Sequence, residues 1–327
     1  MGEALDRFVE PDTAALLADM VADFAGAPAD PTVEQRRQGL EAAAILYGPG
    51  PAEVERVATE TAPSPDGAVP LRIYWPKRTT TGPVPLVLHI HGGGWVLGGP
   101  QAYERVARAY CAAGECIVVD VDYRRAPENR HPAALDDCVA ALDWARRNAR
   151  RLGADPARII VTGDSAGGHL AAATCQVSPA PVALAILVYP VTTASRNAQL
   201  ASRQALGDGR YFLREFDILR AEAEYFPPDQ DREKGPESPL LASDEFLERH
   251  PPTVVFTAGL DPLVDEGRAY VEALRRCGVD AEEVRVEGTI HGFVLFAGRI
   301  GAGRQAIKQI GRRIATAQPA RLPGPPF

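Results

Sequence analysis

The stretch Arg158-Ile-Ile-Val-Thr-Gly-Asp-Ser-Ala-Gly-Gly-His-Leu-Ala-Ala-Ala-Thr174 decides how this chain of 327 residues folds. It begins as a β-branched apolar run and ends as an alanine-rich helix former, so it predicts a buried strand that passes directly into a helix. Between the two lies Gly163-Asp-Ser-Ala-Gly167, the G-x-S-x-G pattern of a nucleophile elbow. Glycines flank the serine at a distance of two residues because so sharp a turn leaves almost no space for side chains. Ser165 is therefore the candidate nucleophile.

Strands alternate with helices on both sides of this stretch. The pattern predicts further strands at residues 85–91, 116–121, 182–189, 253–259 and 281–286, with helices at 103–113, 133–151, 266–277 and 304–315. Helices of this length between strands produce right-handed βαβ units, so the sheet should be mostly parallel. A hairpin at residues 54–61 and 69–75 is expected to precede these units.

We divide the chain into four segments. Residues 1–48 are amphipathic helices, 49–192 the first part of an α/β core, 193–235 a polar and partly helical insertion, and 236–327 the second part of the core. Ligands of open α/β sheets bind at the carboxyl ends of the strands. The insertion and the N-terminal helices should therefore form a cap over that edge of the sheet.

Composition excludes several classes of partner. The formal net charge of −8, with no block of Lys and Arg, argues against nucleic acid. No apolar run has the length of a membrane helix, and the first residues lack the pattern of a signal peptide. We expect no metal, because the sequence holds no cluster of ligands. Five cysteines without a C-x-x-C pair are expected to be reduced residues of a cytoplasmic protein: Cys111, Cys116, Cys138, Cys175 and Cys277.

A serine nucleophile needs a base, and in the elbow architecture this base is a histidine after the last strand. Three histidines follow Ser165 in the chain. His169 should point away along the elbow helix, and His250 stands where a strand begins, at the wrong end of the sheet. His291, in Gly288-Thr-Ile-His-Gly-Phe293, lies just beyond the last predicted strand. We therefore choose His291 as the base.

The carboxylate that orients this histidine should follow the preceding strand, which ends at Leu260-Asp-Pro-Leu-Val-Asp-Glu-Gly267. Asp261 comes first after the strand and is fixed by the proline that follows it, so it is the candidate acid. We expect Asp265 to cap the next helix and Glu266 to lie in its first turn.

Backbone donors for an oxyanion are expected in His91-Gly-Gly-Gly-Trp95, which follows an earlier strand. Glycines let the main chain approach a substrate carbonyl closely. Gly93 with Gly92 or Gly94, together with the N–H of Ala166, would supply the oxyanion hole. The sequence does not decide which two of the three glycines point inwards.

Four segments together resemble the hormone-sensitive-lipase-like family of bacterial esterases: His91-Gly-Gly-Gly-Trp95, Asp122-Tyr-Arg-Arg-Ala-Pro-Glu128, Gly163-Asp-Ser-Ala-Gly-Gly168, and Asp261-Pro-Leu-Val-Asp-Glu-Gly267 with His291-Gly-Phe293. The resemblance spans residues 35–315 in the right order. It implies an α/β-hydrolase fold of about eight strands with a helical cap, no cofactor, and hydrolysis of carboxylic esters with short to medium acyl chains. It also supports Ser165, Asp261 and His291 as a catalytic triad, implies a structural role for residues 122–128, and points to a homodimer through the exposed sheet edge.

Two other functions stay open at this stage. The same triad hydrolyses amides, carbamates or lactones in other proteins, since the chemistry is shared. A non-catalytic receptor for a small ligand on the same fold is the lesser alternative, because the base His291 is present. Five residues are candidates for the substrate pocket, although aromatic side chains at helical spacing are also typical of a core: Trp95, Tyr211, Phe212, Leu213 and Phe293.

Overall fold

The computed structural model describes residues 7–77 and 81–320. The outermost parts of the expected first and last segments, residues 1–6 and 321–327, lie outside this range. The strands of the described chain form one eight-stranded sheet in the order β1-β2-β4-β3-β5-β6-β7-β8. The expected sheet of about eight strands is confirmed. Its strands are β1 Arg56–Ser64, β2 Gly67–Trp75, β3 Val84–Ile90, β4 Ile117–Val121, β5 Ala154–Asp164, β6 Leu184–Val188, β7 Thr253–Ala258 and β8 Ala281–Val286.

The sheet is parallel except at one edge. β1 and β2 form the expected hairpin, in which Ser64 pairs with Gly67, and β2 also runs antiparallel to β4. The remaining neighbours, from β4 through β3 to β8, are parallel. β3 is buried along its whole length because helices cover both faces of the sheet, which explains its almost continuous apolar sequence.

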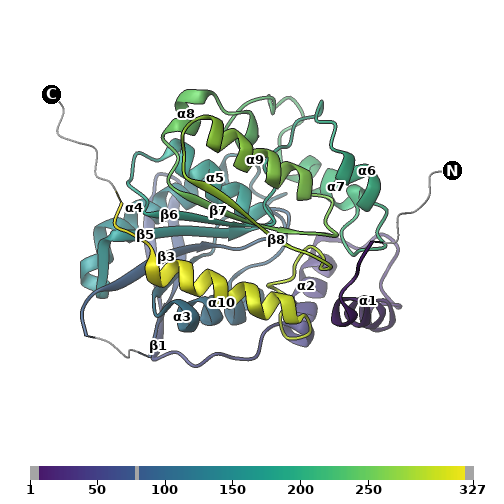
Figure 1. The fold of residues 1–327 in the computed structure, drawn as a ribbon, viewed down its shortest axis with the longest axis horizontal. Helices are drawn as coiled ribbons and strands as arrows, with labels where there is room; N and C mark the ends of the chain where they lie inside the picture. The colour runs from purple at the N-terminus through teal and green to yellow at the C-terminus, as the bar shows by residue number, and fades with distance from the viewer. Residues whose placement is uncertain (1–6, 78–80, 321–327) are drawn as a thin grey trace.

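Helices pack on both faces of the sheet (Figure 1). Side chains of α3 and α10 enter the core on one face, and those of α4, α5 and α9 enter the core on the other. The helices are α1 Pro11–Asp23, α2 Val33–Tyr47, α3 Pro100–Gly114, α4 Ala133–Leu152, α5 Ala166–Val177, α6 Ala201–Leu206, α7 Glu215–Tyr225, α8 Asp244–Glu248, α9 Val264–Arg276 and α10 Gly301–Thr316, with a 3₁₀ turn η1 at Pro239–Leu241.

The long connection between β6 and β7 holds α6, α7, η1 and α8. The sequence predicts the helix seen as α7, but not α6 or α8, which are too short to show a periodic pattern. Figure 1 shows α1, α2, α6 and α7 gathered at one end of the molecule. Within residues 7–77 and 81–320, none of the helices combines the length and the apolar character needed to cross a membrane.

Candidate active site

Ser165 lies at the sharp turn between β5 and α5. Its backbone has φ +55° and ψ −122°, a strained region that residues other than glycine rarely occupy. The flanking glycines are required by space. A Cβ at Gly163 would lie 2.2 Å from the carbonyl oxygen of Gly167, and one at Gly167 would lie 2.1 Å from that of Ile90. Strand, turn and helix therefore have the form expected of a nucleophile elbow.

Two hydrogen bonds join Ser165, His291 and Asp261 into one chain. Nδ1 of His291 lies 2.7 Å from Oδ2 of Asp261, and its Nε2 lies 2.9 Å from the hydroxyl oxygen of Ser165. A carboxylate can only accept, so the ring proton is on Nδ1, which donates to Asp261. Nε2 then keeps a lone pair that accepts the Ser165 O–H. This arrangement allows the imidazole to remove the serine proton.

The loops after β7 and β8 hold the acid and the histidine in place. The N–H of Leu260 donates to the carbonyl oxygen of Thr289 at 2.9 Å, which ties the two loops together. The second carboxylate oxygen of Asp261 accepts the N–H of Leu263 at 2.9 Å. Asp261 is fully buried, whereas His291 keeps a small exposed edge. The acid is therefore rigidly oriented and the imidazole can still reach a substrate.

The other two histidines after the elbow are bonded elsewhere. Nδ1 of His169 accepts the indole N–H of Trp95 at 3.2 Å, and its Nε2 lies 3.1 Å from the carbonyl oxygen of Glu237. His250 lies 2.9 Å from the hydroxyl of Thr253. Burial lowers the pKa of His169 to about 3 and that of His250 to about 4, so both stay neutral near pH 7.

The turn after β3 contains Gly92, Gly93 and Gly94, and we call it the glycine turn. One of its backbone amides already donates a hydrogen bond within the protein. The N–H of Gly92 donates to Oδ1 of Asp164 at 3.0 Å, and the other carboxylate oxygen of Asp164 accepts the Tyr103 hydroxyl at 3.0 Å. Gly93 and Gly94 have φ +110° and +60°, and both line the cleft beside Ser165. In the part of the chain that the structure describes, the amides of these two glycines have no hydrogen-bond partner.

Ala166 is the first residue of α5, so its N–H has no partner within the helix. The N-terminal end of a helix also carries partial positive charge, which favours an anion at this point. Among the described residues, three backbone donors are therefore without a hydrogen-bond partner: those of Gly93 and Gly94 in the turn, and that of Ala166, the residue after Ser165.

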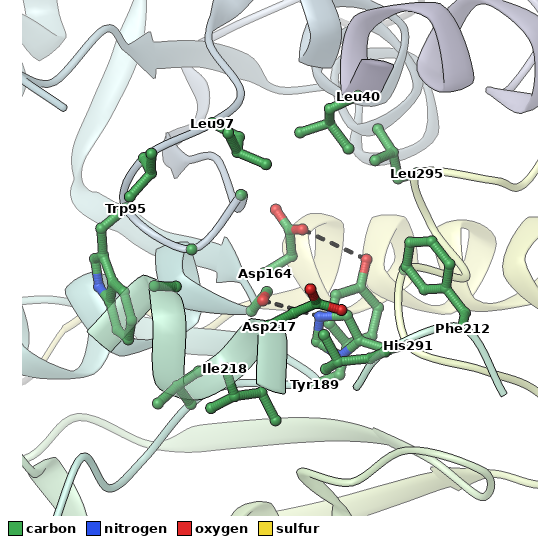
Figure 2. A pocket seen from close by; sticks show the side chains of 18 of the residues that line it. Leu40, Trp95, Leu97, Asp164, Tyr189, Phe212, Asp217, Ile218, His291 and Leu295 are labelled. Atoms are coloured by element: carbon green, nitrogen blue, oxygen red, sulfur yellow. Dashed lines mark hydrogen bonds between the residues drawn. The ribbon is translucent and has the colours of Figure 1, made fainter. Parts of the chain in front are cut away.

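A cleft with a cavity volume of about 240 Å³ opens above Ser165. Figure 2 shows Asp164 and His291 between Leu40, Leu97 and Leu295 on one side and Ile218 on the other. Its walls come from α2, from the glycine turn, from α7 and the segment that leads into it, and from the loop after His291. The wall side chains that the sequence did not point to include Arg36, Leu40, Leu97, Val191, Asp217, Ile218, Arg220, Ala221, Leu263, Leu295 and Phe296.

Of the five expected pocket residues, Trp95, Phe212 and Leu213 line this cleft. The indole of Trp95 also stacks on Tyr225, with ring centroids 4.8 Å apart. Among the described residues that form the walls, Tyr211 and Phe293 do not occur. Phe293 is fully buried and packs edge-on against Tyr189, and Tyr211 packs on the apolar core.

Asp265 does not cap α9, so this expectation was wrong. The helix begins at Val264, and Asp265 instead accepts the N–H of Ser202 at 2.8 Å. The short helix α6 brings Ser202 there, and no pattern in the sequence predicts that helix. Glu266 lies in the first turn of α9, as expected.

Residues 122–128 form a salt-bridged loop beside the glycine turn. Arg124 pairs with Asp137 at 2.8 Å, and Glu128 pairs with Arg37 of α2 at 2.8 Å. Arg125 donates to the carbonyl oxygen of Gly98 at 2.6 Å.

Across residues 7–77 and 81–320, no three His, Cys, Asp or Glu side chains are grouped as metal ligands would be.

Comparison with known proteins adds an independent line of argument. A family model described as alpha/beta hydrolase fold matches residues 87–295. Carboxylesterase NlhH of Mycobacterium tuberculosis is 38% identical over 244 residues, which cover 73% of this chain and 75% of that protein. An arylesterase of Saccharolobus solfataricus is 37% identical over 251 residues, which cover 75% of this chain and 78% of that protein.

Solved structures that resemble this chain also include an ester-hydrolase and an esterase. The ester-hydrolase EH1AB1 from the metagenome of Lake Arreo matches with a TM-score of 0.87 and 35% identity, over 94% of this chain and 98% of that one. A hyperthermophilic esterase of the archaeon Pyrobaculum calidifontis matches with a TM-score of 0.85 and 33% identity, over 94% and 98% of the two chains.

Proposed function

The chain belongs to the α/β-hydrolase fold family, in its hormone-sensitive-lipase-like branch, and on this basis we propose that it hydrolyses small carboxylic esters with Ser165 as the nucleophile. The observation that carries the proposal is the hydrogen-bonded chain from Ser165 through His291 to Asp261 beside the cleft. The names of the relatives, carboxylesterase, arylesterase and esterase, support the same reaction.

The first half of the reaction forms an acyl-enzyme. Ser165 Oγ attacks the ester carbonyl carbon while its proton passes to Nε2 of His291. Asp261 holds the imidazole in the correct tautomer and stabilises its positive charge. His291 then gives the proton to the departing alkoxide oxygen, so an alcohol leaves and the acyl group stays bonded to Oγ.

The second half consumes one water molecule. His291 takes a proton from water, whose oxygen attacks the acyl carbon. The bond to Ser165 Oγ then breaks, the serine regains its proton from His291, and a carboxylic acid leaves. The sum is one ester and one water converted into one alcohol and one acid.

We assign the oxyanion to the backbone amides of Gly93, Gly94 and Ala166. Gly92 is excluded from this set because its N–H already donates to Asp164. The positive φ angles of Gly93 and Gly94 would strain any other residue, which supports a turn built to present its amides.

The cleft favours a short to medium acyl chain. Its volume of about 240 Å³ suits a small ester, and most of the side chains that line it are apolar. Amides, carbamates and lactones share the triad chemistry and remain the second candidate substrates. The receptor alternative is disfavoured because His291 is engaged with Ser165.

The test is hydrolysis of p-nitrophenyl esters from acetate to palmitate, with Ser165→Ala as the control. We expect a rate that peaks at short to medium chains and disappears in the variant. A wild-type protein that leaves every chain length intact would contradict ester hydrolysis and turn attention to amides and lactones.

We also propose that residues 1–48 and 193–235 act as a cap over the core segments 49–192 and 236–327. The support is that α2 and α7, which belong to the two cap segments, both supply walls of the cleft. A homodimer through the sheet edge and a cytoplasmic location stay predictions. Sedimentation equilibrium tests the homodimer, for which twice the mass of the chain is expected.

A further inference from the structure

Four charged side chains that the reaction does not use lie buried beside the site. Arg203, Glu222, Arg232 and Glu266 are 7%, 4%, 8% and 0% exposed. We call them the buried charge cluster. Two are arginines and two are glutamates, so their formal charges cancel when both carboxyl groups are ionised. They come from α6, α7, the chain after α7, and α9, so the cluster joins elements that are separate in the fold.

Arg203 is the centre of this cluster. Its Nη2 donates to Oε2 of Glu266 at 2.8 Å, and its Nε donates to the same oxygen at 3.2 Å. Its Nη1 lies 3.5 Å from Oε1 of Glu222, whose second oxygen lies 3.3 Å from Nη1 of Arg232. Arg203 therefore connects a carboxylate of α9 with a carboxylate of α7.

On one side, the cluster reaches the segment that carries Asp261. Glu266 is five residues beyond Asp261 in the chain, in the first turn of α9. Ser202, next to Arg203, donates its N–H to Asp265 at 2.8 Å and its hydroxyl to the carbonyl oxygen of Pro262 at 2.6 Å. The start of α6 thus holds residues 261–266 at three points.

On the other side, the cluster reaches the wall of the cleft. Glu222 follows Ala221 in α7 and lies one turn beyond Ile218, and both of these residues line the cleft. The Cβ of Ala221 would lie only 3.0 Å from a Cβ at Gly94, so the wall rests directly on the glycine turn. A small shift of α7 therefore changes the space beside the Ser165 hydroxyl.

Buried ion pairs contribute little net stability, because desolvation offsets most of their attraction, but they can fix one arrangement of the elements they join. We propose that Arg203 and Glu222 are positioning residues that hold the α7 wall of the cleft in register with the Asp261 segment, and so set how tightly the ester is bound. This inference rests on the proposed ester hydrolysis.

The test compares Glu222→Gln with Glu215→Gln, the same substitution on the same helix but outside the cluster. For p-nitrophenyl butyrate we expect Glu222→Gln to raise KM by about 3- to 10-fold with kcat within about twofold of wild type. The preference between acetate and octanoate should also flatten. Glu215→Gln should leave both constants within about twofold.

A binding measurement separates this proposal from the proposed function. In Ser165→Ala, the dissociation constant of uncleaved p-nitrophenyl butyrate is measured by calorimetry with and without Glu222→Gln. The added substitution should weaken binding by about the same factor as it raises KM. If the wild-type protein hydrolyses no ester, the proposed function fails, whereas this pair of variants still tests the role of Glu222 in ligand binding.

Two results would overturn the proposal. A Glu222→Gln protein that melts at a lower temperature but keeps KM, kcat and the dissociation constant unchanged would make the cluster purely structural. A loss of kcat at constant KM would place its effect on Asp261 and not on the wall. Should Glu222→Gln fail to fold, Arg203→Lys takes its place in the test. Lysine keeps the positive charge but lacks the paired N–H donors of the guanidinium group, so the same rise in KM is expected.

Discussion

The backbone N–H of Gly92 donates a 3.0 Å hydrogen bond to the carboxylate of Asp164, the residue immediately before Ser165. This bond fixes the glycine turn after β3 to the nucleophile elbow after β5. It also occupies the first of the three glycine amides, whereas those of Gly93 and Gly94 have no hydrogen-bond partner among the described residues. In the proposed mechanism, the position of the oxyanion donors relative to the serine hydroxyl therefore depends on the side chain of Asp164.

Asp164→Ala should lower kcat by about 10- to 100-fold, because the turn loses the bond that fixes its amides. KM should change by less than about threefold. Asp164→Asn keeps an oxygen that accepts the Gly92 N–H, so it should retain most of the activity. Steady-state kinetics on p-nitrophenyl butyrate checks both variants. Equal activity of the alanine variant and the wild type would show that the turn needs no such support.

Asp261→Asn should lower kcat by roughly 10⁴-fold, since an amide can donate to His291 and stabilise the wrong tautomer of the ring. The fold should be retained, because asparagine has nearly the same size and can still accept the Leu263 N–H. Steady-state kinetics measures the loss of kcat, and a circular dichroism spectrum checks that the variant is folded. A loss below about tenfold in a folded variant would mean that another group orients the histidine.

Phe212→Ala should shift the substrate preference towards longer acyl chains. Phe212 lines the cleft, is 38% exposed, and packs edge-on against Phe296 with centroids 5.2 Å apart. Its φ of +77° is unusual for a bulky residue, so the loop holds this ring in place at some cost. We expect kcat/KM for the decanoate relative to the butyrate to rise by about 3- to 10-fold.

The control for this variant is Phe216→Ala, because Phe216 is 62% exposed on α7. Among the described side chains that line the cleft, Phe216 does not occur. Its removal should leave the chain-length profile as it is in the wild type. Identical profiles for all three proteins would exclude Phe212 as a determinant of acyl length.

Glu222 should also make stability depend on pH. Burial raises the pKa of Glu222 to about 7 from an ordinary value of 4.5, and Arg203 and Arg232 oppose this shift. A carboxyl group whose pKa is higher in the folded state contributes stability that is present below about pH 4.5 and lost as the pH rises through about 7. Glutamine does not ionise, so the Glu222→Gln variant does not lose this contribution to stability as the pH rises.

The free energy of unfolding of the wild type minus that of Glu222→Gln should therefore fall between pH 5 and pH 8, by about 1–3 kcal/mol. Urea unfolding at the two pH values gives this difference. For Glu215→Gln the corresponding difference should stay constant within about 0.5 kcal/mol. A difference for Glu222→Gln that grows with pH would mean that the folded state favours the charged carboxylate.

The fold and the residues placed around Ser165 could be predicted largely from sequence because their signals are local. A β-branched run, two glycines at fixed distance from a serine, and an alanine-rich helix lie within 17 residues, from Arg158 to Thr174. The acid and the histidine follow from chain order, since parallel strands bring their carboxyl ends to one edge of the sheet.

The free glycine amides and the walls of the cleft could not be predicted, because they depend on contacts between residues that are distant in the sequence. Which glycine amides are free is decided by Asp164, 72 positions from Gly92. Part of the wall comes from the amphipathic helices α2 and α7, and an apolar helix face looks the same in sequence whether it meets a core or a cleft, so Leu40 and Ile218 were missed. Phe293 was expected in the pocket, but it is fully buried in the non-helical loop after His291, and Phe296, three residues later in the same loop, lines the cleft.

The central claim is that Ser165, activated by His291, becomes acylated. The most direct measurement is mass spectrometry of the protein quenched with acid during turnover of p-nitrophenyl butyrate, followed by peptide mapping. We predict a butyryl group on Ser165 in the wild type, none in Ser165→Ala, and acylation at least about 10³-fold slower in His291→Ala. Turnover with no adduct on Ser165, or an adduct on another residue, would contradict the account.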